Sequence, residues 1–204
     1  MSAGASFWEM DELRLITGAM VILGGATTLL VVMPYLLLEN VRPPTALKPY
    51  TSEQLAGRRS YIANGCVYCH SQQPRDMKQA PDAKRGWGRA SVAGDYAYDT
   101  PYLLGTMRTG PDLMNIGARQ PSKDWHLGHL YQPRAYTPGS IMPSYPYLFE
   151  LRKGQPKPGE TIVNLPPALA NPGEVVVAKP ETLALVSYLL SLDRTYPALA
   201  EERR

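Results

Sequence analysis

An uninterrupted apolar segment near the N-terminus is the strongest pattern in the chain. No Asp, Glu, Lys, Arg or His occurs between Leu15 and Leu38. A helix of this length, rising 1.5 Å per residue, reaches ~36 Å and crosses a hydrocarbon layer of ~30 Å with some tilt. A cleaved signal peptide is the alternative, but its apolar core spans only ~7–15 residues behind a basic start, whereas this longer run follows acidic residues. The pattern predicts a retained transmembrane helix at 15–38, preceded by a short segment, 1–14.

After the anchor the pattern changes to short apolar runs. Residues 39–50 contain Pro43, Pro44 and Pro49, which predicts a semi-rigid, extended linker. The 204-residue chain has 20 Pro and 17 Gly, and they divide the remainder into short elements joined by turns. Because domains usually have ~100–200 residues, we expect residues 51–204 to form a single domain.

Two segments of this domain have helical periodicity. Thr51 and Gln54 have the spacing of a capping box, and an Asn-Gly pair ends the helix that they begin. A second helix is predicted from Thr182 to Leu192, with its Leu and Tyr residues on one face. We expect this face to cross the first helix at Gly57 and Tyr61.

Charge and cysteine content narrow the possible functions. The chain has 21 Lys and Arg against 18 Asp and Glu, a net charge of only +3. This argues against a nucleic-acid binder. The two Cys residues, Cys66 and Cys69, are too close in sequence to hold a fold together by a disulfide.

The chemistry of the chain is concentrated in the motif that begins at Cys66. The sequence Cys66-Val67-Tyr68-Cys69-His70 has the Cys-x-x-Cys-His form of a covalent c-type haem attachment site. Two thiols one helical turn apart can reach the two vinyl groups on one edge of a porphyrin, and the adjacent imidazole then lies beneath the iron. We therefore predict one haem c bound by Cys66, Cys69 and His70.

Two other kinds of site use closely spaced cysteines. A redox dithiol needs a thioredoxin-like pattern of strand and helix, which this region lacks, and it has no use for the His. A zinc site needs a second pair of ligands, but the chain has no further Cys, and His126 and His129 lie far away in sequence. Both alternatives are weaker than haem attachment.

Haem attachment also predicts the orientation of the anchor. The machinery that forms the thioether bonds works on the outer side of the bacterial inner membrane, which makes the haem domain periplasmic and places residues 1–14 inside. Arg42 and Lys48, just beyond the anchor, mildly favour the opposite orientation, because positive charges near an anchor tend to stay on the inner side. Large domains, however, translocate largely regardless of such charges.

The haem iron needs a second axial ligand unless its sixth position is open. Met142 is the preferred ligand, because the Pro-rich segment 138–146 is stiff and loses little entropy when it holds a thioether against the iron. Methionine ligation suits electron transfer, whereas an open position suits the chemistry of small ligands. The remaining candidates are Met77, Met107, Met114, His126 and His129.

A turn at residues 108–113 is expected to support the haem ligand. The carbonyl of Pro111 is placed to accept the Nδ1 hydrogen of His70, which would make the ligand more basic. Arg108 stands just before the Gly-Pro-Asp sequence of this turn and is expected to neutralise a haem propionate. Simple solvent exposure of Arg108 is the alternative.

Several longer strings are more specific than the Cys-x-x-Cys-His motif alone. They are LKPYTSEQLAGRRSYIANGCVYCHSQ, SVAGDYAYDTPYLLGTMRTGPDL, DWHLGHLYQPR and SIMPSYPYL. With the anchor, they make the chain resemble the monohaem subunit II of cytochrome cbb3 oxidases, the C-type haem–copper oxygen reductases. The resemblance implies a mainly α protein, with one N-terminal transmembrane helix and a class I-like cytochrome c domain with long loops. The family's haem ligands map onto His70 and Met142.

The resemblance also implies function and partners. Such a subunit relays electrons to a catalytic haem–copper subunit and does no oxygen chemistry itself. A dihaem cytochrome c subunit, a donor cytochrome and the lipid bilayer are its other expected partners.

Other functions remain open at this stage. The chain departs from the family pattern at residues 73–90, which are expected to form a loop near the haem edge or a partner. A haem c subunit of a nitric oxide reductase is the alternative within the same physical class. A haem enzyme or gas sensor with an open sixth position is the alternative from a different class, and it would bind carbon monoxide.

Overall fold

The computed structural model describes residues 12–39, 41–105 and 107–198. It separates into two compact units, Met1–Arg42 and Pro43–Arg204. Most of the predicted linker, 39–50, is therefore part of the second unit, where Leu47 is only 7% exposed. The predicted N-terminal segment, 1–14, lies mostly outside the described residues.

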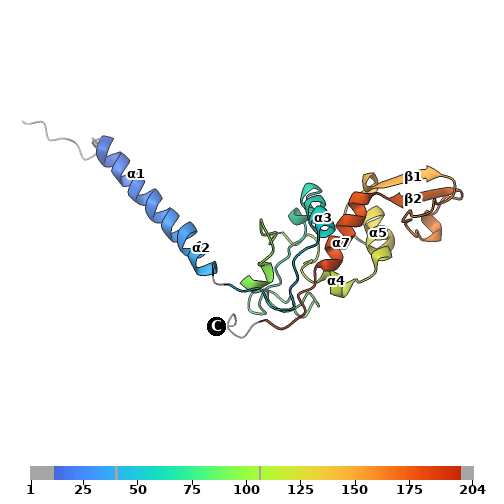
Figure 1. The fold of residues 1–204 in the computed structure, drawn as a ribbon. Coiled ribbons are helices and arrows are strands. Elements are labelled where there is room, and N and C mark those ends of the chain that lie inside the picture. Colours follow the sequence, from blue (N-terminus) through green and yellow to red (C-terminus); the bar gives the residue numbers. More distant parts are fainter. Residues whose placement is uncertain (1–11, 40, 106, 199–204) are drawn as a thin grey trace, which may run out of the picture. The chain divides into compact units, whose positions relative to one another are not determined.

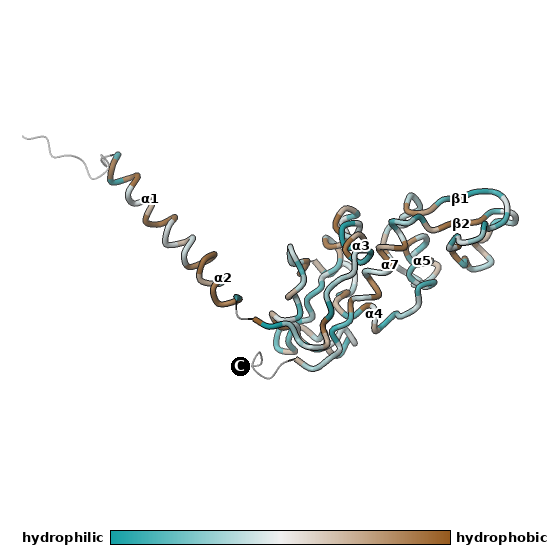
Figure 2. The backbone as a smooth tube through the Cα atoms, viewed as in Figure 1, coloured by the Kyte–Doolittle hydropathy of each residue, from teal (hydrophilic) through white to brown (hydrophobic). Residues whose placement is uncertain are grey.

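The described part of the first unit contains one continuous helix made of three segments. They are α1 (Glu12–Thr27), a π-helical turn (Thr28–Val32) and α2 (Met33–Leu38) (Figure 1). The helix is long and apolar enough to cross a membrane: a window within it has a mean hydropathy of 2.2, and none of that window is buried within the structure (Figure 2). The π-helical turn ends two residues before Pro34, whose missing N–H interrupts the regular bonding pattern.

The second unit begins with helix α3 (Ser52–Ala63), which has the predicted ends. The Thr51 N–H donates to Gln54 Oε1 at 2.9 Å, and the Gln54 N–H donates to Thr51 Oγ1 at 3.2 Å. Gly65, with a φ of 69°, follows the helix in the left-handed conformation that glycine adopts at low cost. The capping box and the glycine stop confirm the sequence prediction.

Helix α7 (Pro180–Ser191) packs directly against α3, and the two lie side by side in Figure 1. A Cβ atom at Gly57 would overlap the backbone of Ala184, so the helices approach each other at a glycine. The rings of Tyr61 and Tyr188 meet edge to face, with centroids 5.6 Å apart. The predicted crossing at Gly57 and Tyr61 is confirmed.

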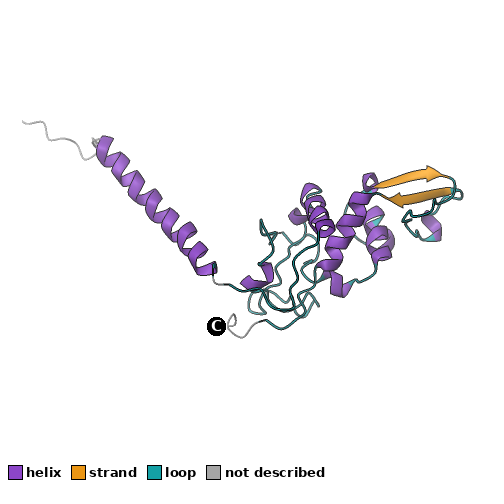
Figure 3. Cartoon of the chain, viewed as in Figure 1, coloured by secondary structure: helices purple, strands orange, loops and turns teal. Residues whose placement is uncertain are grey.

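Short helices and long loops make up most of the remaining domain, and the fold is mainly helical as predicted (Figure 3). The short α-helices are α4 (Ile116–Arg119), α5 (Lys123–Tyr131) and α6 (Pro133–Tyr136). The 3₁₀ turns are Cys66–Tyr68, Ala93–Tyr96, Pro146–Leu148 and Pro167–Leu169.

A β-hairpin precedes α7 and was not predicted. Strands β1 (Phe149–Lys153) and β2 (Glu174–Ala178) pair antiparallel, with Phe149 opposite Ala178. The run of Val residues in β2 is typical of a strand, and it is the sequence feature from which this strand could have been predicted. Its partner lies across a connection from residue 154 to 173, and sequence periodicity cannot specify such a pairing.

Ion pairs to buried carboxylates hold the loops to the helical core. Arg58 of α3 meets Asp99 at 3.2 Å, and Arg89 meets Asp95 at 2.7 Å. Arg194 donates to the hydroxyl of Tyr50 at 3.1 Å. The start of the domain, a central loop and the C-terminal segment are thus joined beside α3.

Candidate haem-attachment site

The cysteine motif forms a single tight turn directly after α3. The N–H groups of Cys69 and His70 both donate to the carbonyl of Cys66, at 3.2 and 3.0 Å. Cys66 is half-buried and Cys69 is exposed, and both are free thiols. Burial raises the pKa of the Cys66 thiol to about 11. Both thiols and the imidazole therefore come from the same few residues, as covalent haem attachment requires.

His70 is held by the carbonyl of Pro111. Its Nδ1 lies 2.7 Å from that oxygen, and because a carbonyl only accepts, Nδ1 carries the hydrogen. This leaves Nε2 as the nitrogen with a free lone pair for a metal. Burial lowers the pKa of His70, while the Pro111 bond and the charge of Asp112 oppose this shift. The contact expected from the sequence is present, and the imidazole is favoured in its neutral, ligating form.

Glycines leave room for this imidazole. A Cβ atom at Gly110 would overlap the ring of His70, and one at Gly105 would lie 2.7 Å from the His70 carbonyl oxygen. The Gly110 N–H donates to Cys69 O at 2.9 Å, and the Leu113 N–H donates to Ser71 O at 2.8 Å. The turn at 110–113 is therefore attached to the motif along its backbone.

Asp112 secures the residues that follow His70. Its buried carboxylate accepts from the Ser71 hydroxyl at 2.6 Å and from the N–H groups of Gln73 and Met114 at 2.7 and 2.9 Å. Burial raises the pKa of Asp112, and these hydrogen bonds together with the charge of Arg108 oppose that rise. Gln72, in the same stretch, exchanges hydrogen bonds with the Tyr188 hydroxyl of α7 at 3.1 Å.

Arg108 lies behind the motif and not in solvent, because its side chain is only 13% exposed. Its Nη1 donates to Asp82 at 2.7 Å, its Nη2 to the Gln73 carbonyl at 2.7 Å and its Nε to the Ser71 hydroxyl at 3.1 Å. The alternative of solvent exposure is therefore wrong. The contact with a propionate stays a prediction.

The atypical segment 73–90 supplies the partner of Arg108. Asp82 is fully buried, and it also accepts from the Arg75 N–H at 2.7 Å. The Trp87 ring has the guanidinium groups of Arg85 and Arg108 over it, at 4.9 and 5.4 Å from its centroid. Sequence reasoning missed Asp82, since nothing in the local pattern links it to a residue 26 positions later.

The residues that follow Met142 are tied to the same region. The Tyr147 hydroxyl donates to Asn64 Oδ1 at 2.7 Å, directly before the cysteine turn. The Tyr145 N–H donates to Leu130 O of α5 at 3.0 Å. Met142 is partly buried against the hydrophobic core, and Cys66 packs against the same core.

The other candidate axial ligands have different surroundings. Met114 is 1% exposed within the core, whereas Met77 and Met107 are exposed. His126 is buried, and its Nε2 donates to Gln120 O at 2.8 Å. His129 stacks on Trp125 with ring centroids 4.5 Å apart. Burial lowers the pKa of His129 to about 4, with smaller contributions from His126 and His70.

The described residues contain no cluster of three or more His, Cys, Asp or Glu that could hold a metal ion. The cysteine pair therefore has no further ligands for zinc in that part of the chain. The donor set fits haem c instead. It consists of two thiols in one turn and an imidazole with a free Nε2, and glycines leave space around that imidazole.

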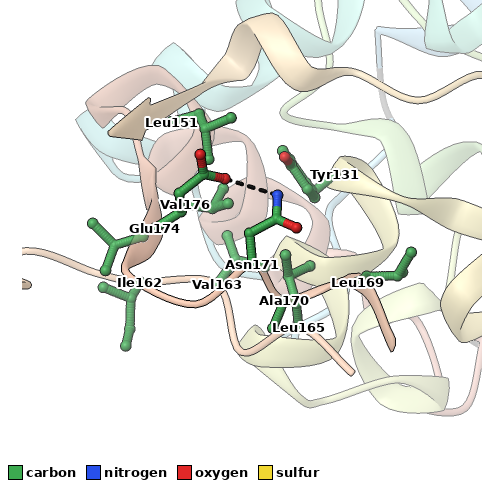
Figure 4. A pocket seen from close by; sticks show the side chains of 11 residues that line it. Tyr131, Leu151, Ile162, Val163, Leu165, Leu169, Ala170, Asn171, Glu174 and Val176 are labelled. Carbon is green, nitrogen blue, oxygen red and sulfur yellow. Dashed lines mark hydrogen bonds between the residues drawn. The ribbon is translucent and has the colours of Figure 1, made fainter. Parts of the chain in front are cut away.

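An apolar pocket of about 130 Å³ lies elsewhere, between the hairpin and α5 (Figure 4). Tyr131, Leu151 and Val176 are among its lining residues, and Asn171 donates to Glu174 at its rim at 2.8 Å. None of the predicted haem-site residues lines it. It is therefore separate from the haem-attachment site.

An apolar helix followed by a mainly helical domain with a Cys-x-x-Cys-His turn defines a membrane-anchored c-type cytochrome. Residues 5–163 match the family described as cytochrome c oxidase, mono-heme subunit/FixO, and the chain belongs to that family. A comparison with curated proteins gave no significant match. The chain is thus a membrane-anchored monohaem cytochrome c subunit of a cbb3-type oxidase, and its cofactor is haem c. A catalytic oxidase subunit is its partner.

Proposed function

We propose that this subunit relays electrons, one at a time, to the catalytic haem–copper subunit that reduces oxygen to water. The observation that carries the proposal is the Cys66–His70 turn, whose imidazole is oriented by Pro111 and leaves Nε2 free. When bound, haem c supplies a centre that takes up and releases one electron.

Each residue of the site has a defined role in this proposal. Cys66 and Cys69 form the two thioether bonds, and His70 Nε2 is the proximal ligand. Pro111 fixes the tautomer of His70 and increases its basicity. Met142 would supply the distal ligand, and the stiff segment 138–146 would hold its sulfur in place.

Rigidity around His70 supports electron transfer over chemistry at the iron. The backbone bonds from Gly110 and Leu113, with the carboxylate of Asp112, restrain the motif on one side. Arg108, paired with Asp82, holds the same stretch through Ser71 and Gln73. A site that changes little in geometry between oxidation states needs little reorganisation for each transfer.

The topology and the wider partners belong to the same proposal. The helix Glu12–Leu38 is retained and keeps the haem domain on the periplasmic side of the inner membrane. A dihaem cytochrome c subunit or a donor cytochrome supplies the electrons. The family match favours the oxygen reductase over a nitric oxide reductase. The hydrogen bonds of Tyr145 and Tyr147, which hold the chain just after Met142, favour a closed iron over an open-site sensor.

The relay is tested by stopped-flow mixing of the purified oxidase complex with a reduced donor. We expect the haem c absorbance to become reduced first and then reoxidised as electrons reach the catalytic subunit. The Met142→His complex should retain covalent haem but lose most donor-driven oxygen consumption, because its lowered potential makes electron entry unfavourable. Met107→Leu, at an exposed methionine, is the matched control. Full donor-driven turnover in Met142→His, despite the lowered potential, would contradict the relay.

A further inference from the structure

The positive charge of the chain is concentrated in residues 75–90, which we call the basic loop. This stretch contains five Lys or Arg residues and two Asp residues, a surplus of three positive charges. The surplus equals the net charge of the whole chain, which is +3. The rest of the chain is therefore neutral overall, and the basic loop lies within the segment that departs from the family pattern.

The basic loop is closed at its ends and held by hydrogen bonds to its backbone. The Ser91 N–H donates to Pro74 O at 3.0 Å, and the Trp87 N–H donates to Asp82 O at 3.0 Å. The side-chain amide of Asn115 donates to Trp87 O at 2.8 Å. A compact surface loop of ~6–16 residues whose ends meet is an Ω-loop, a type of element that frequently carries function. The loop therefore presents its side chains from a defined backbone.

Most cations of the basic loop have no acidic partner. Lys78, Lys84 and Arg85 are exposed, and Arg75 is half-buried. Among the described residues, none of these four side chains lies within ion-pair distance of a carboxylate. Like charges gathered on one loop repel one another. A partner that brings carboxylates to this surface would relieve that repulsion.

The two acidic residues of the basic loop leave most of this charge uncompensated. Asp82 is fully buried, and its charge is paired with Arg108 at 2.7 Å. Asp76 is exposed, and its Oδ1 accepts from the Lys78 N–H at 2.8 Å. The exposed side chains of the loop therefore carry three positive charges against one negative charge.

The basic loop is joined to the haem-attachment turn through two side chains. The Trp87 ring has the guanidinium of Arg85 on it at 4.9 Å from its centroid and that of Arg108 at 5.4 Å. Arg108 in turn donates to the Ser71 hydroxyl and the Gln73 carbonyl, which follow the cysteine motif directly. A protein that docks on the exposed Arg85 is therefore brought close to the residues that hold the proposed redox centre.

The exposed side chains of the basic loop favour a protein partner over a lipid surface. A segment that binds a membrane combines cations with several aromatic or aliphatic side chains that enter the lipid. Met77, 46% exposed, is the large apolar side chain that this loop projects, and Trp87 is half-buried beneath two guanidinium groups. Exposed charge with little apolar area is typical of transient redox complexes, which associate by electrostatic attraction over a small interface.

We propose that the basic loop is the docking surface for an electron-donor protein with an acidic face. Carboxylates of the donor lie against Lys78, Lys84 and Arg85 while its electron passes to this subunit. The proposal rests on the electron relay proposed above and specifies the chemistry of the donor. Because the attraction is between exposed charges, it accelerates association at low salt and weakens as salt is added.

The test is stopped-flow reduction of the purified full complex by a lysine-rich, soluble c-type cytochrome. This probe is used unmodified, with its basic surface, and with its lysines succinylated, which makes the surface acidic. We expect the succinylated form to react faster at low ionic strength and to slow as salt is added. Lys84→Glu or Arg85→Glu should slow it several-fold. The triple variant with Lys78→Glu should slow it at least ~10-fold, since charge steering raises association rates by ~10–10³.

Matched variants and cross-linking locate the effect. Lys153→Glu makes the same charge change at an exposed position of β1 and should keep the native rate. Lys84→Arg keeps the charge and should also keep the native rate. In the native complex, a carbodiimide should join carboxylates of the succinylated probe to the amines of Lys78 and Lys84, as identified by mass spectrometry. Cross-links at Lys153 with none in the basic loop would overturn the proposal.

The remaining outcomes separate this proposal from the relay and from a lipid role. Equal rates for the native complex and the triple variant at low salt, with electrons still passing to the catalytic subunit, defeat only the docking surface. A native complex in which no donor reduces the haem c of this subunit defeats the relay itself. The rate difference should persist in nanodiscs of neutral lipid. A difference seen only in nanodiscs that contain anionic lipid would assign the loop to the membrane surface and overturn the proposal.

Discussion

Gly110 and His70 pack so closely that a Cβ atom at position 110 would overlap the imidazole ring. The Gly110 N–H donates to Cys69 O at 2.9 Å, so the Gly110 backbone cannot move away from His70 without loss of this hydrogen bond. The glycine is therefore required by the position of the His70 imidazole and not by turn geometry.

We expect Gly110→Ala to displace His70 and to reduce the amount of low-spin haem c in the complex several-fold. An added methyl group in a packed site typically costs ~1–3 kcal/mol, and here the obstacle is a ring whose Nδ1 is held by the Pro111 carbonyl. The measurement is the haem c absorbance per mole of complex. Thr109→Ala, at the exposed neighbour, should match the native protein. A native spectrum in Gly110→Ala would show that the ring has another stable position.

Replacement of Cys66 or Cys69 by Ala should leave little assembled subunit. The domain has long loops, and a covalently bound macrocycle that binds the folded state stabilises it further. Haem staining after denaturing electrophoresis is the measurement, with the anchor detected separately by mass spectrometry. Covalent haem that survives the double Ala replacement would disprove the attachment site.

Met142→Ala should open the iron to exogenous ligands and stop turnover of the complex. A thioether sulfur stabilises ferrous iron, so its loss also lowers the potential. The sulfur-to-iron charge-transfer band in the near-infrared spectrum of the ferric subunit should be present in the native protein and absent in the variant. Met107→Leu should keep the band, because that side chain is exposed.

Persistence of the band in Met142→Ala would instead assign the ligand to Met77, Met107 or Met114. Carbon monoxide binding provides an independent check. It should be slow or absent in the native ferrous subunit and rapid in Met142→Ala. Rapid binding to the native subunit would favour the open-site alternative.

Acid should destabilise the domain through His129. Its pKa in the folded protein is lowered to about 4 from 6.5, so the unfolded chain binds the proton first as the pH falls. The stability that comes from the neutral ring is complete above pH 6.5 and is lost progressively towards pH 4. The free energy of unfolding, measured against pH, should fall less steeply in His129→Gln. Equal slopes for the two proteins would contradict the shift.

Local sequence patterns were sufficient for several parts of this protein. The apolar run 15–38, the capping box at Thr51 and the Cys66–His70 turn each depend on spacing within one helix or one turn. Even the α3–α7 crossing followed from a small residue on one helix and an apolar face on the other. Short-range geometry determines these features, and the amino-acid order specifies it directly.

Only the tertiary structure decided which distant groups meet. Arg108 pairs with Asp82, Tyr147 bonds to Asn64, and Arg119 keeps a buried Nε beside the turn that holds His70. The hairpin and the packing of residues 43–50 onto the domain are of the same kind. Such contacts depend on the way in which the long loops close and on which buried polar groups find partners. Those outcomes depend on the whole packed chain, whereas the periodicity of a segment reports only its own local conformation.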